Sequence, residues 1–386
     1  MRSHGGSDAV REVRGGLVLG ATGEWGLEPL CIAEGRFSEA AGDGRILDAR
    51  GCMVLPGIVD FHGDAFERLI MPRPQVNIPL GLALAEADRQ LAANGITTAF
   101  HGITCSWEGG LRGRDNARRV IDGLRSMNGH ASVSHQIHLR FECHDLESEA
   151  SVGRWLADGD IDFLAFNEHL PGMRRKPHRL REYADRAGLS EEAFVARLEV
   201  TASRGDAVPQ AVARLAALAR EHGVPMASHD DDSCERRDHF ERLGCGVSEF
   251  PLNVAVARRA RERGAAIVCG APNVLRGGSH VGAPKAADLA LEGLCDVLAS
   301  DYYYPAPLAA AFRLAGETGI AFPVAWAMVS SNPARAAGLA DRGRIECGAV
   351  ADLILVDDQD DDSPRVVATV SRGRLVYLAP GASLHD

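Results

Sequence analysis

Apolar, β-branched runs alternate with helical patterns through the middle of this chain, and this alternation constrains the fold more than any other feature of the sequence. The candidate strands are residues 54–62, 96–103, 135–143, 161–167, 224–229, 246–251, 266–271 and 296–301. The helical patterns between them include residues 80–94, 115–126, 190–202, 208–222, 253–263 and 284–292. Strands that alternate with helices favour a parallel sheet, and eight such units are typical of a (β/α)8 barrel.

The two ends of the chain have a different sequence pattern, in which Gly-rich turns separate short strand-like runs. These runs are residues 13–19, 30–33, 45–47, 53–55, 348–356 and 366–378. Such a pattern predicts a small all-β unit that draws on both termini. We therefore expect residues 1–56 to form the N-terminal part of this unit, residues 57–337 the barrel, and residues 338–386 the C-terminal part.

Composition excludes several classes of protein. With 46% hydrophobic and 25% charged residues, the chain has an ordinary globular composition, and its formal net charge of −11 argues against a nucleic-acid surface. No apolar run approaches the roughly 20 residues that span a bilayer. The nine cysteines include no Cys-x-x-Cys pair, which favours reduced thiols in a cytoplasmic protein. The sequence does not determine the oligomeric state, and a homo-oligomer is one of the possibilities.

Residues that can bind a metal stand where the predicted strands end. His62 and Asp64 follow the first strand, and because side chains alternate along a strand they should point the same way. Active sites of these barrels lie at the carboxyl ends of the strands, so the later ends should converge on the same place. The predicted ligands of a divalent metal, zinc first and manganese or iron as alternatives, are His62, Asp64, Glu142, His169, His229 and Asp301.

Each of these residues also has a structural interpretation. His62 can be a hydrogen-bonded core histidine, Asp64 can cap a helix, and Glu142 can pair with an arginine. His169 is as typical of a substrate contact or a structural residue as of a ligand. The residues for which we favour the structural interpretation are His101, His138 and the carboxylates at 230–232.

The chemistry that follows is hydrolysis. A metal held by histidines and carboxylates activates water, and Asp301 at the end of the last strand could accept the proton. The segment Arg276-Gly277-Gly278-Ser279-His280 offers cationic groups and backbone N–H donors to an anion, although it could equally be a Gly-rich turn that Arg276 fastens. The predicted substrate-binding residues are Arg73, Asn273, Arg276, Ser279 and His280.

Several motifs resemble the amidohydrolase superfamily. They are Leu55-Pro56-Gly57 leading into His62, then His229, Asp301 and Ala351-Asp352-Leu353. The resemblance implies a metal-bearing (β/α)8 barrel with a small β-sandwich built from both termini. Such a protein would be a metal-dependent hydrolase.

Within the superfamily, nearly the whole chain resembles the α-D-ribose 1-methylphosphonate 5-triphosphate diphosphatases of the bacterial carbon–phosphorus lyase pathway. The matching segments are residues 71–74, 94–98, 139–142, 169–172, 228–231, 249–251, 270–280 and 300–303. The resemblance implies a role in phosphonate metabolism, with release of diphosphate from a small phosphorylated substrate, a ribose triphosphate.

Two segments depart from the pattern of that family. Its first motif usually reads His-Thr-Asp-Asn, where this chain has His62-Gly63-Asp64-Ala65, and its Asp-His-x-Pro-Gly-Gln corresponds to Glu168-His169-Leu170-Pro171-Gly172-Met173. The metal positions are kept while the expected substrate wall differs. An amide or cyclic-amide hydrolase, such as a deacetylase or deaminase, is therefore the alternative function. A non-catalytic binding protein is disfavoured because His62, His229 and Asp301 are all present.

Overall fold

Eight parallel strands form a single curled sheet in the computed structural model, which describes residues 8–127, 129–279, 282–359, 364–380 and 383–385. The strands are β8 (Ile58–Gly63), β9 (Ile96–Cys105), β10 (Ser134–Glu142), β11 (Phe163–Asn167), β12 (Met226–His229), β13 (Val247–Glu249), β14 (Ala266–Gly270) and β15 (Val297–Ala299). They lie in sequence order, and a parallel bridge between Gly63 and Asp301 joins the two end strands. The predicted (β/α)8 barrel is confirmed.

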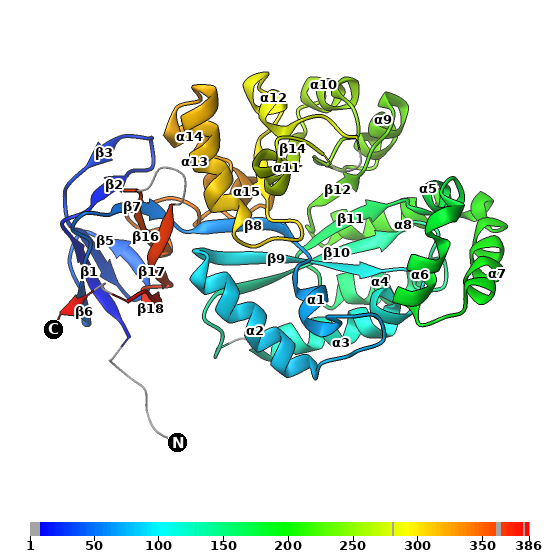
Figure 1. Ribbon diagram of the computed structural model, residues 1–386, viewed down its shortest axis with the longest axis horizontal. Helices are drawn as coiled ribbons and strands as arrows, with labels where there is room; N and C mark the ends of the chain where they lie inside the picture. Colours follow the sequence, from blue (N-terminus) through cyan, green and yellow to red (C-terminus); the bar gives the residue numbers. More distant parts are fainter. Residues whose placement is uncertain (1–7, 128, 280–281, 360–363, 381–382, 386) are drawn as a thin grey trace.

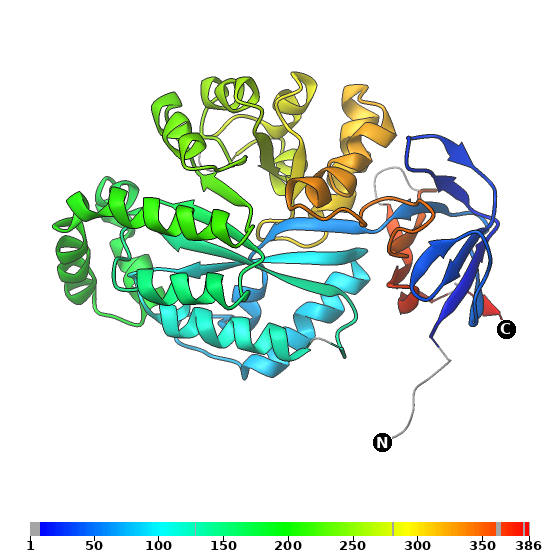
Figure 2. The same cartoon turned by 180° about the vertical axis from the view of Figure 1, so that it is seen from behind.

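Helices surround this sheet in both views of the molecule (Figures 1 and 2). The principal ones are α2 (Leu80–Ala93), α3 (Arg114–Met127), α4 (Glu149–Ala157), α8 (Val208–Glu221), α9 (Cys234–Arg242), α10 (Val254–Glu262), α12 (Ala286–Leu291) and α13 (Ala306–Thr318). The sequence patterns predicted most of these but not α4, α9 or α13. Helix α9 buries only Arg237 and Phe240, so it lacks the apolar stripe on which such predictions depend. Its start is marked instead by Ser233, whose hydroxyl accepts from the backbone N–H of Arg236 at 3.2 Å.

Aromatic side chains fill the interior of the barrel beneath its mouth. The ring of Phe61 lies 6.0 Å from that of Phe100 and 4.9 Å from that of Phe163, measured between centroids. These rings come from β8, β9 and β11, and all three are buried. A barrel packed in this way is no channel, so a ligand can enter only at the strand ends.

Two further sheets form a β-sandwich at one end of the molecule, and they are built from the first and last described segments of the chain (Figure 1). One sheet contains β1 (Val10–Arg14), β4 (Leu30–Ala33), β5 (Arg36–Ser38), β6 (Arg45–Asp48) and β19 (Leu384–His385). The other contains β2 (Leu17–Leu19), β3 (Trp25–Gly26), β7 (Met53–Pro56), β16 (Leu353–Asp357), β17 (Arg365–Ser371) and β18 (Arg374–Leu378). The run at 13–19, expected to be one strand, is divided between β1 and β2, because Gly15 turns the chain with φ of 82°.

An extra helical segment lies between β11 and α8, at the end of the barrel that is far from the sandwich (Figure 1). It contains α5 (Leu170–Arg174), α6 (Leu180–Ala187) and α7 (Glu191–Ala202). Its own small core includes Trp107, Tyr183 and Phe194, so the segment is packed and not a loose loop. Among the described residues, no helix is long and apolar enough to cross a membrane.

Gly57 alone separates β7 of the sandwich from β8 of the barrel, and its N–H donates to Asp352 O at 2.9 Å. A Cβ at this position would lie 2.4 Å from Oγ1 and 2.6 Å from Cγ2 of Thr97, which is fully buried. The junction therefore depends on the absence of a side chain.

We expect Gly57→Ala to lower the free energy of unfolding by about 1–3 kcal/mol, because the buried, β-branched Thr97 cannot rotate away without strain. Denaturant unfolding monitored by circular dichroism measures the change. The matched control is Gly81→Ala in α2, where nothing lies within 4 Å of the added Cβ and helix propensity predicts a gain of up to about 1 kcal/mol. Equal effects of the two substitutions would contradict the steric explanation.

Candidate active site

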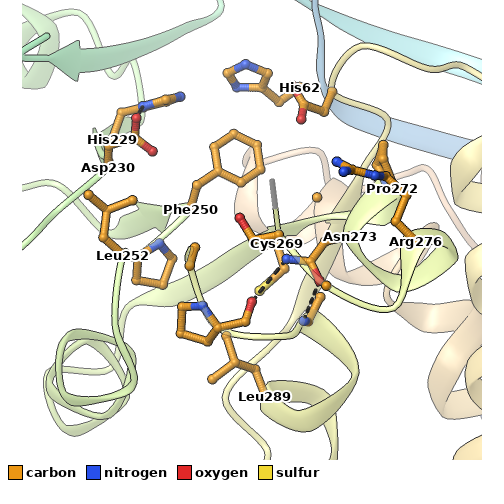
Figure 3. Close-up of a pocket in the computed structure, with 18 of the residues that line it drawn as sticks. His62, His229, Asp230, Phe250, Leu252, Cys269, Pro272, Asn273, Arg276 and Leu289 are labelled. Carbon is orange, nitrogen blue, oxygen red and sulfur yellow. Dashed lines mark hydrogen bonds and ion pairs between the residues drawn. The ribbon is translucent and has the colours of Figure 1, made fainter. Parts of the chain in front are cut away.

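A pocket opens where the barrel strands end, and Figure 3 shows His62, His229 and Asp230 along one edge of it. The polar lining also includes Arg140 and Asp301. The apolar lining includes Phe250, Leu252, Pro272 and Leu289. The histidines therefore face a partly water-excluding cavity, in which electrostatic interactions are stronger than in bulk water.

Left-handed backbone places three of these side chains within two residues of the ends of their strands. The φ angles are 55° at Asp230, 52° at Phe250 and 55° at Asp301. Aspartate enters this region more readily than most residues, but for a phenylalanine it costs on the order of 1–3 kcal/mol. The turn brings the Phe250 ring to 5.1 Å from the His62 ring and 5.2 Å from the His229 ring, between centroids. The strained backbone at Phe250 thus places its ring against both histidines.

His62 lies on the floor of the pocket and is 1% exposed. Its Nδ1 is 3.1 Å from Oε1 of Glu249, and Nε2 of His138 lies 3.5 Å from the same oxygen. Burial lowers the pKa of His62 well below its ordinary range, and the neighbouring Arg140 and His229 lower it further. His62 is therefore a neutral imidazole, which is the form that binds metals.

A second group of donors lies beside it. His169 forms a short contact with Oε1 of Glu142 through Nδ1, and its Nε2 is 3.4 Å from Oδ2 of Asp230. His229 Nδ1 lies 3.5 Å from that same oxygen. Burial alone would lower the pKa of His169, but Glu142 and Asp230 outweigh it and raise the pKa to about 9. Burial alone would raise the pKa of Glu142, and His169 instead holds it at about 2.

Arg140 lies between two of the predicted ligands. Its Nη1 donates to Oδ2 of Asp64 at 3.2 Å, and its Nη2 is 3.4 Å from Nε2 of His229. Asp64 in turn donates its backbone N–H to Asp301 O, and Asp301 donates to His62 O, both at 2.8 Å. Burial, and next the charge of Asp64, raise the pKa of the Asp301 carboxyl to about 7.

The donors fit a divalent cation. Two groups of three residues hold their ligand atoms within 4.8 Å of one another, namely His62 with His138 and Glu249, and His169 with His229 and Asp230. Within the described part of the chain, the buried polar atoms that find no hydrogen-bond partner include His138 Nε2, His229 Nδ1 and Glu249 Oε2. Buried imidazole and carboxylate atoms without partners are costly unless a cation or a proton satisfies them. Imidazole nitrogen with carboxylate oxygen is the donor set that zinc prefers.

The predicted ligands come together, but in pairings that the sequence did not indicate. His169 and His229 belong to one group and His62 to the other. Glu142 contacts His169 where an arginine was the structural alternative, and Asp64 contacts Arg140 where a helix cap was considered. Both carboxylates thus have partners of opposite charge.

The predicted ligands and substrate contacts leave out four residues of this site, His138, Arg140, Asp230 and Glu249, although Asp230 and Glu249 stand where the fifth and sixth predicted strands end. A signal for two of them was present, because His138, Arg140 and Glu142 stand at i, i+2 and i+4 on β10 and so project from one face of the strand. Asp230 was interpreted as part of a cap, and its left-handed backbone is what turns it inward.

The predicted substrate-binding residues differ in their positions. Arg276, the last residue of α11 (Ala271–Arg276), is exposed and lines the pocket, as does Ser279. Asn273 also lines it, but its amide donates to Pro284 O and accepts from Ala286 N, both at 3.0 Å, which fastens the loop before α12. Arg73 lies in an exposed turn after α1 (Phe66–Ile70) and outside the lining of this pocket, and His280 lies outside the described residues.

Comparisons with known proteins agree with this architecture. A model of the Amidohydrolase family matches residues 313–377. A curated relative, alpha-D-ribose 1-methylphosphonate 5-triphosphate diphosphatase of Escherichia coli (strain K12), is 32% identical over 327 residues, which are 82% of this chain and 86% of the relative.

Two solved structures show the same fold. The β-aspartyl dipeptidase from Fervidobacterium islandicum AW-1 is 14% identical, with a TM-score of 0.64 and 99% of each chain covered. Molinate hydrolase is also 14% identical, with a TM-score of 0.63, covering 96% of this chain and 94% of its own. At such identities the likeness establishes the fold alone.

The His169–Glu142 pair predicts a pH dependence of stability. Because the pKa of His169 is raised from 6.5 to about 9, its contribution is complete below pH 6.5 and is lost as the pH rises through 9. In chelator-treated protein we expect the free energy of unfolding to fall between pH 7.5 and 9.5, on the order of 1–3 kcal/mol. The control is His169→Gln, in which this decline should be absent. Parallel pH profiles for the two proteins would refute the assignment.

Proposed function

This chain belongs to the amidohydrolase superfamily and, within it, to the family of alpha-D-ribose 1-methylphosphonate 5-triphosphate diphosphatase, and we propose that it releases diphosphate from a ribose 5-triphosphate that carries a phosphonate. Membership makes the chain a metal-dependent hydrolase of this superfamily. The proposal for the substrate is carried by one observation, the 32% identity to the Escherichia coli diphosphatase over most of both chains.

The proposed reaction is hydrolysis of one anhydride bond. Water adds to the α-phosphorus, the bond between the α-phosphorus and its bridging oxygen breaks, and diphosphate leaves with the bonding electrons. A ribose 5-phosphate that keeps its phosphonate remains. The enzyme must therefore bind several negative charges, hold water and accept one proton.

We assign metal binding to His62, His169, His229 and Asp301, with Asp230 beside them. When bound, a divalent cation would supply Lewis acidity toward the phosphoryl oxygen and promote ionisation of water. Three imidazoles in this set favour zinc over magnesium or calcium, and manganese and iron are the alternatives.

Asp301 is suited to accept the proton of the attacking water. It lines the pocket, and burial raises the pKa of its carboxyl to about 7, close to the pH at which a general base works best. Its place is fixed by the backbone, because its N–H donates to His62 O at 2.8 Å. The same carboxyl can later return the proton to the leaving diphosphate.

Two guanidinium groups can hold the phosphates. Arg140 is buried and lines the pocket, and its Nε has no partner among the described residues. Arg276 also lines the pocket, across from His229 and Asp230 in Figure 3, and is exposed. Guanidinium forks bind phosphate oxygens in pairs, so the substrate would lie with its phosphate chain between these two arginines.

Turnover of the triphosphate tests this function. We expect metal-loaded protein to release diphosphate from α-D-ribose 1-methylphosphonate 5-triphosphate, and His229→Ala to lose both bound metal and activity, because a ligand is removed. Coupled detection of diphosphate and elemental analysis provide the two measurements. No turnover of the triphosphate by metal-loaded protein would reject this substrate, and hydrolysis of amides or cyclic amides by the same preparation would establish the alternative function.

Arg276→Ala should weaken substrate binding by about 1.5–3 kcal/mol, the scale of hydrogen bonds to a charged group, which raises KM about 10- to 100-fold. Metal content should not change, because arginine is not a ligand. The matched control is Arg258→Ala on α10, an exposed arginine outside the lining of the pocket that pairs with Glu292. A KM within about twofold of wild type for Arg276→Ala would show that Arg276 only fastens its loop.

A further inference from the structure

A carboxylate lies between two histidines directly beneath the pocket, and the proposed reaction gives no role to two of these three residues. Glu249 comes from β13, His62 from β8 and His138 from β10, and all three are at most 1% exposed. Oε1 of Glu249 is 3.1 Å from His62 Nδ1 and 3.5 Å from His138 Nε2. Of the three, only His62 lines the pocket.

The hydrogen bond to Glu249 determines the tautomer of His62. A carboxylate oxygen accepts, so the proton on the His62 ring is at Nδ1, and Nε2 keeps its lone pair. Space is available at that nitrogen because residue 102 is a glycine. A Cβ at Gly102 would lie only 3.1 Å from Nε2 and 3.3 Å from Cδ2 of His62.

His138 lies on the other side of Glu249. Its Nδ1 lies 3.1 Å from Phe61 O, and its ring packs against Phe61 and Phe163, with centroids 5.8 and 4.8 Å apart. With the His138 proton at Nδ1 and directed at Phe61 O, its Nε2 has no hydrogen to offer, so among the described residues the carboxylate of Glu249 has the His62 Nδ1–H as its side-chain donor. The arrangement fixes both the orientation of the His62 ring and the position of its proton.

We propose that Glu249 is a positioning residue, which holds His62 so that Nε2 is presented to the cation of the active site. The inference rests on the proposed metal-dependent function and deepens it. A metal-binding histidine typically donates its other ring N–H to a carboxylate, and loss of that partner weakens metal binding about 10- to 100-fold. Glu249 is buried and outside the lining of the pocket, whereas His62 lines it, so His62 is the member of this group that a cation in the pocket can contact.

The chain contains a matched control for this experiment. Asp88 of α2 lies 3.1 Å from His135 Nε2, and His135 Nδ1 lies 2.8 Å from His101 Nε2. This group has the same chemistry of a carboxylate and two histidines and is also buried, but none of its members lines the pocket. Asp88→Asn therefore reports what loss of such a charge does to the fold alone.

The test compares Glu249→Gln with Asp88→Asn in the full-length protein. Zinc dissociation constants come from competition with a chromophoric chelator, and nitrogen-15 NMR of the histidine rings in metal-free protein reports the tautomer of His62. For Glu249→Gln we expect a dissociation constant about 10- to 100-fold higher, an unchanged number of bound ions, and a His62 ring that no longer favours Nδ1–H. For Asp88→Asn both measurements should match the wild type.

Two results would overturn the proposal. One is a dissociation constant within twofold of wild type together with an unchanged tautomer. The other is loss of a whole equivalent of zinc, which would make Glu249 a ligand. Should Glu249→Gln fail to fold, Glu249→Asp replaces it. This variant keeps the charge but is shorter by one methylene, and the same changes in zinc dissociation constant and His62 tautomer are expected. A wild-type protein that binds no divalent cation would refute the proposed function, whereas the tautomer measurement would still decide the role of Glu249.

Discussion

Closure of the barrel between its first and last strands is the interaction on which the site depends. Asp60 on β8 accepts from the backbone N–H of Ser300 at 2.9 Å and from its hydroxyl at 2.6 Å. The adjoining backbone bonds tie His62 to Asp301, which are far apart in the sequence. Burial raises the pKa of Asp60 to about 6, so this link costs desolvation, which its two hydrogen bonds offset. Without closure, the proposed proton acceptor and the first histidine would not share a pocket.

Buried charge is the second constraint, because this mouth places carboxylates, imidazoles and a guanidinium within a few ångströms of one another. Two of these carboxylates are tolerable because each has a partner of opposite charge, Arg140 for Asp64 and His169 for Glu142. Pairs of this kind add little net stability to a fold and are costly to break. The left-handed backbone at Phe250 also costs free energy without adding stability to the fold. The protein thus maintains locally unfavourable features around the strand ends, as expected where binding or catalysis requires them.

Much of the architecture could be predicted from the sequence, since it depends on local patterns. Short apolar runs mark all eight barrel strands, and the amphipathic run at 80–94 marks α2 with its buried face of Ala83, Leu84 and Leu91. Strand ends such as His229 could be recognised as candidates because parallel strands of a barrel bring their carboxyl ends to one side. Helix α9 could not be predicted in this way, since it buries only two residues and so its sequence has almost no apolar periodicity.

The sequence by itself determined which residue types reach the mouth of the barrel, because alternation along a strand is a local property of the chain. Only the tertiary structure decided which of them meet. Glu249 faces His62 and His138 because β13, β8 and β10 place these three side chains at the same height across the barrel. That height depends on the stagger of strands that are not neighbours in sequence, and hydrogen-bond partners change with shifts of a few ångströms. Local patterns contain no information on such distances.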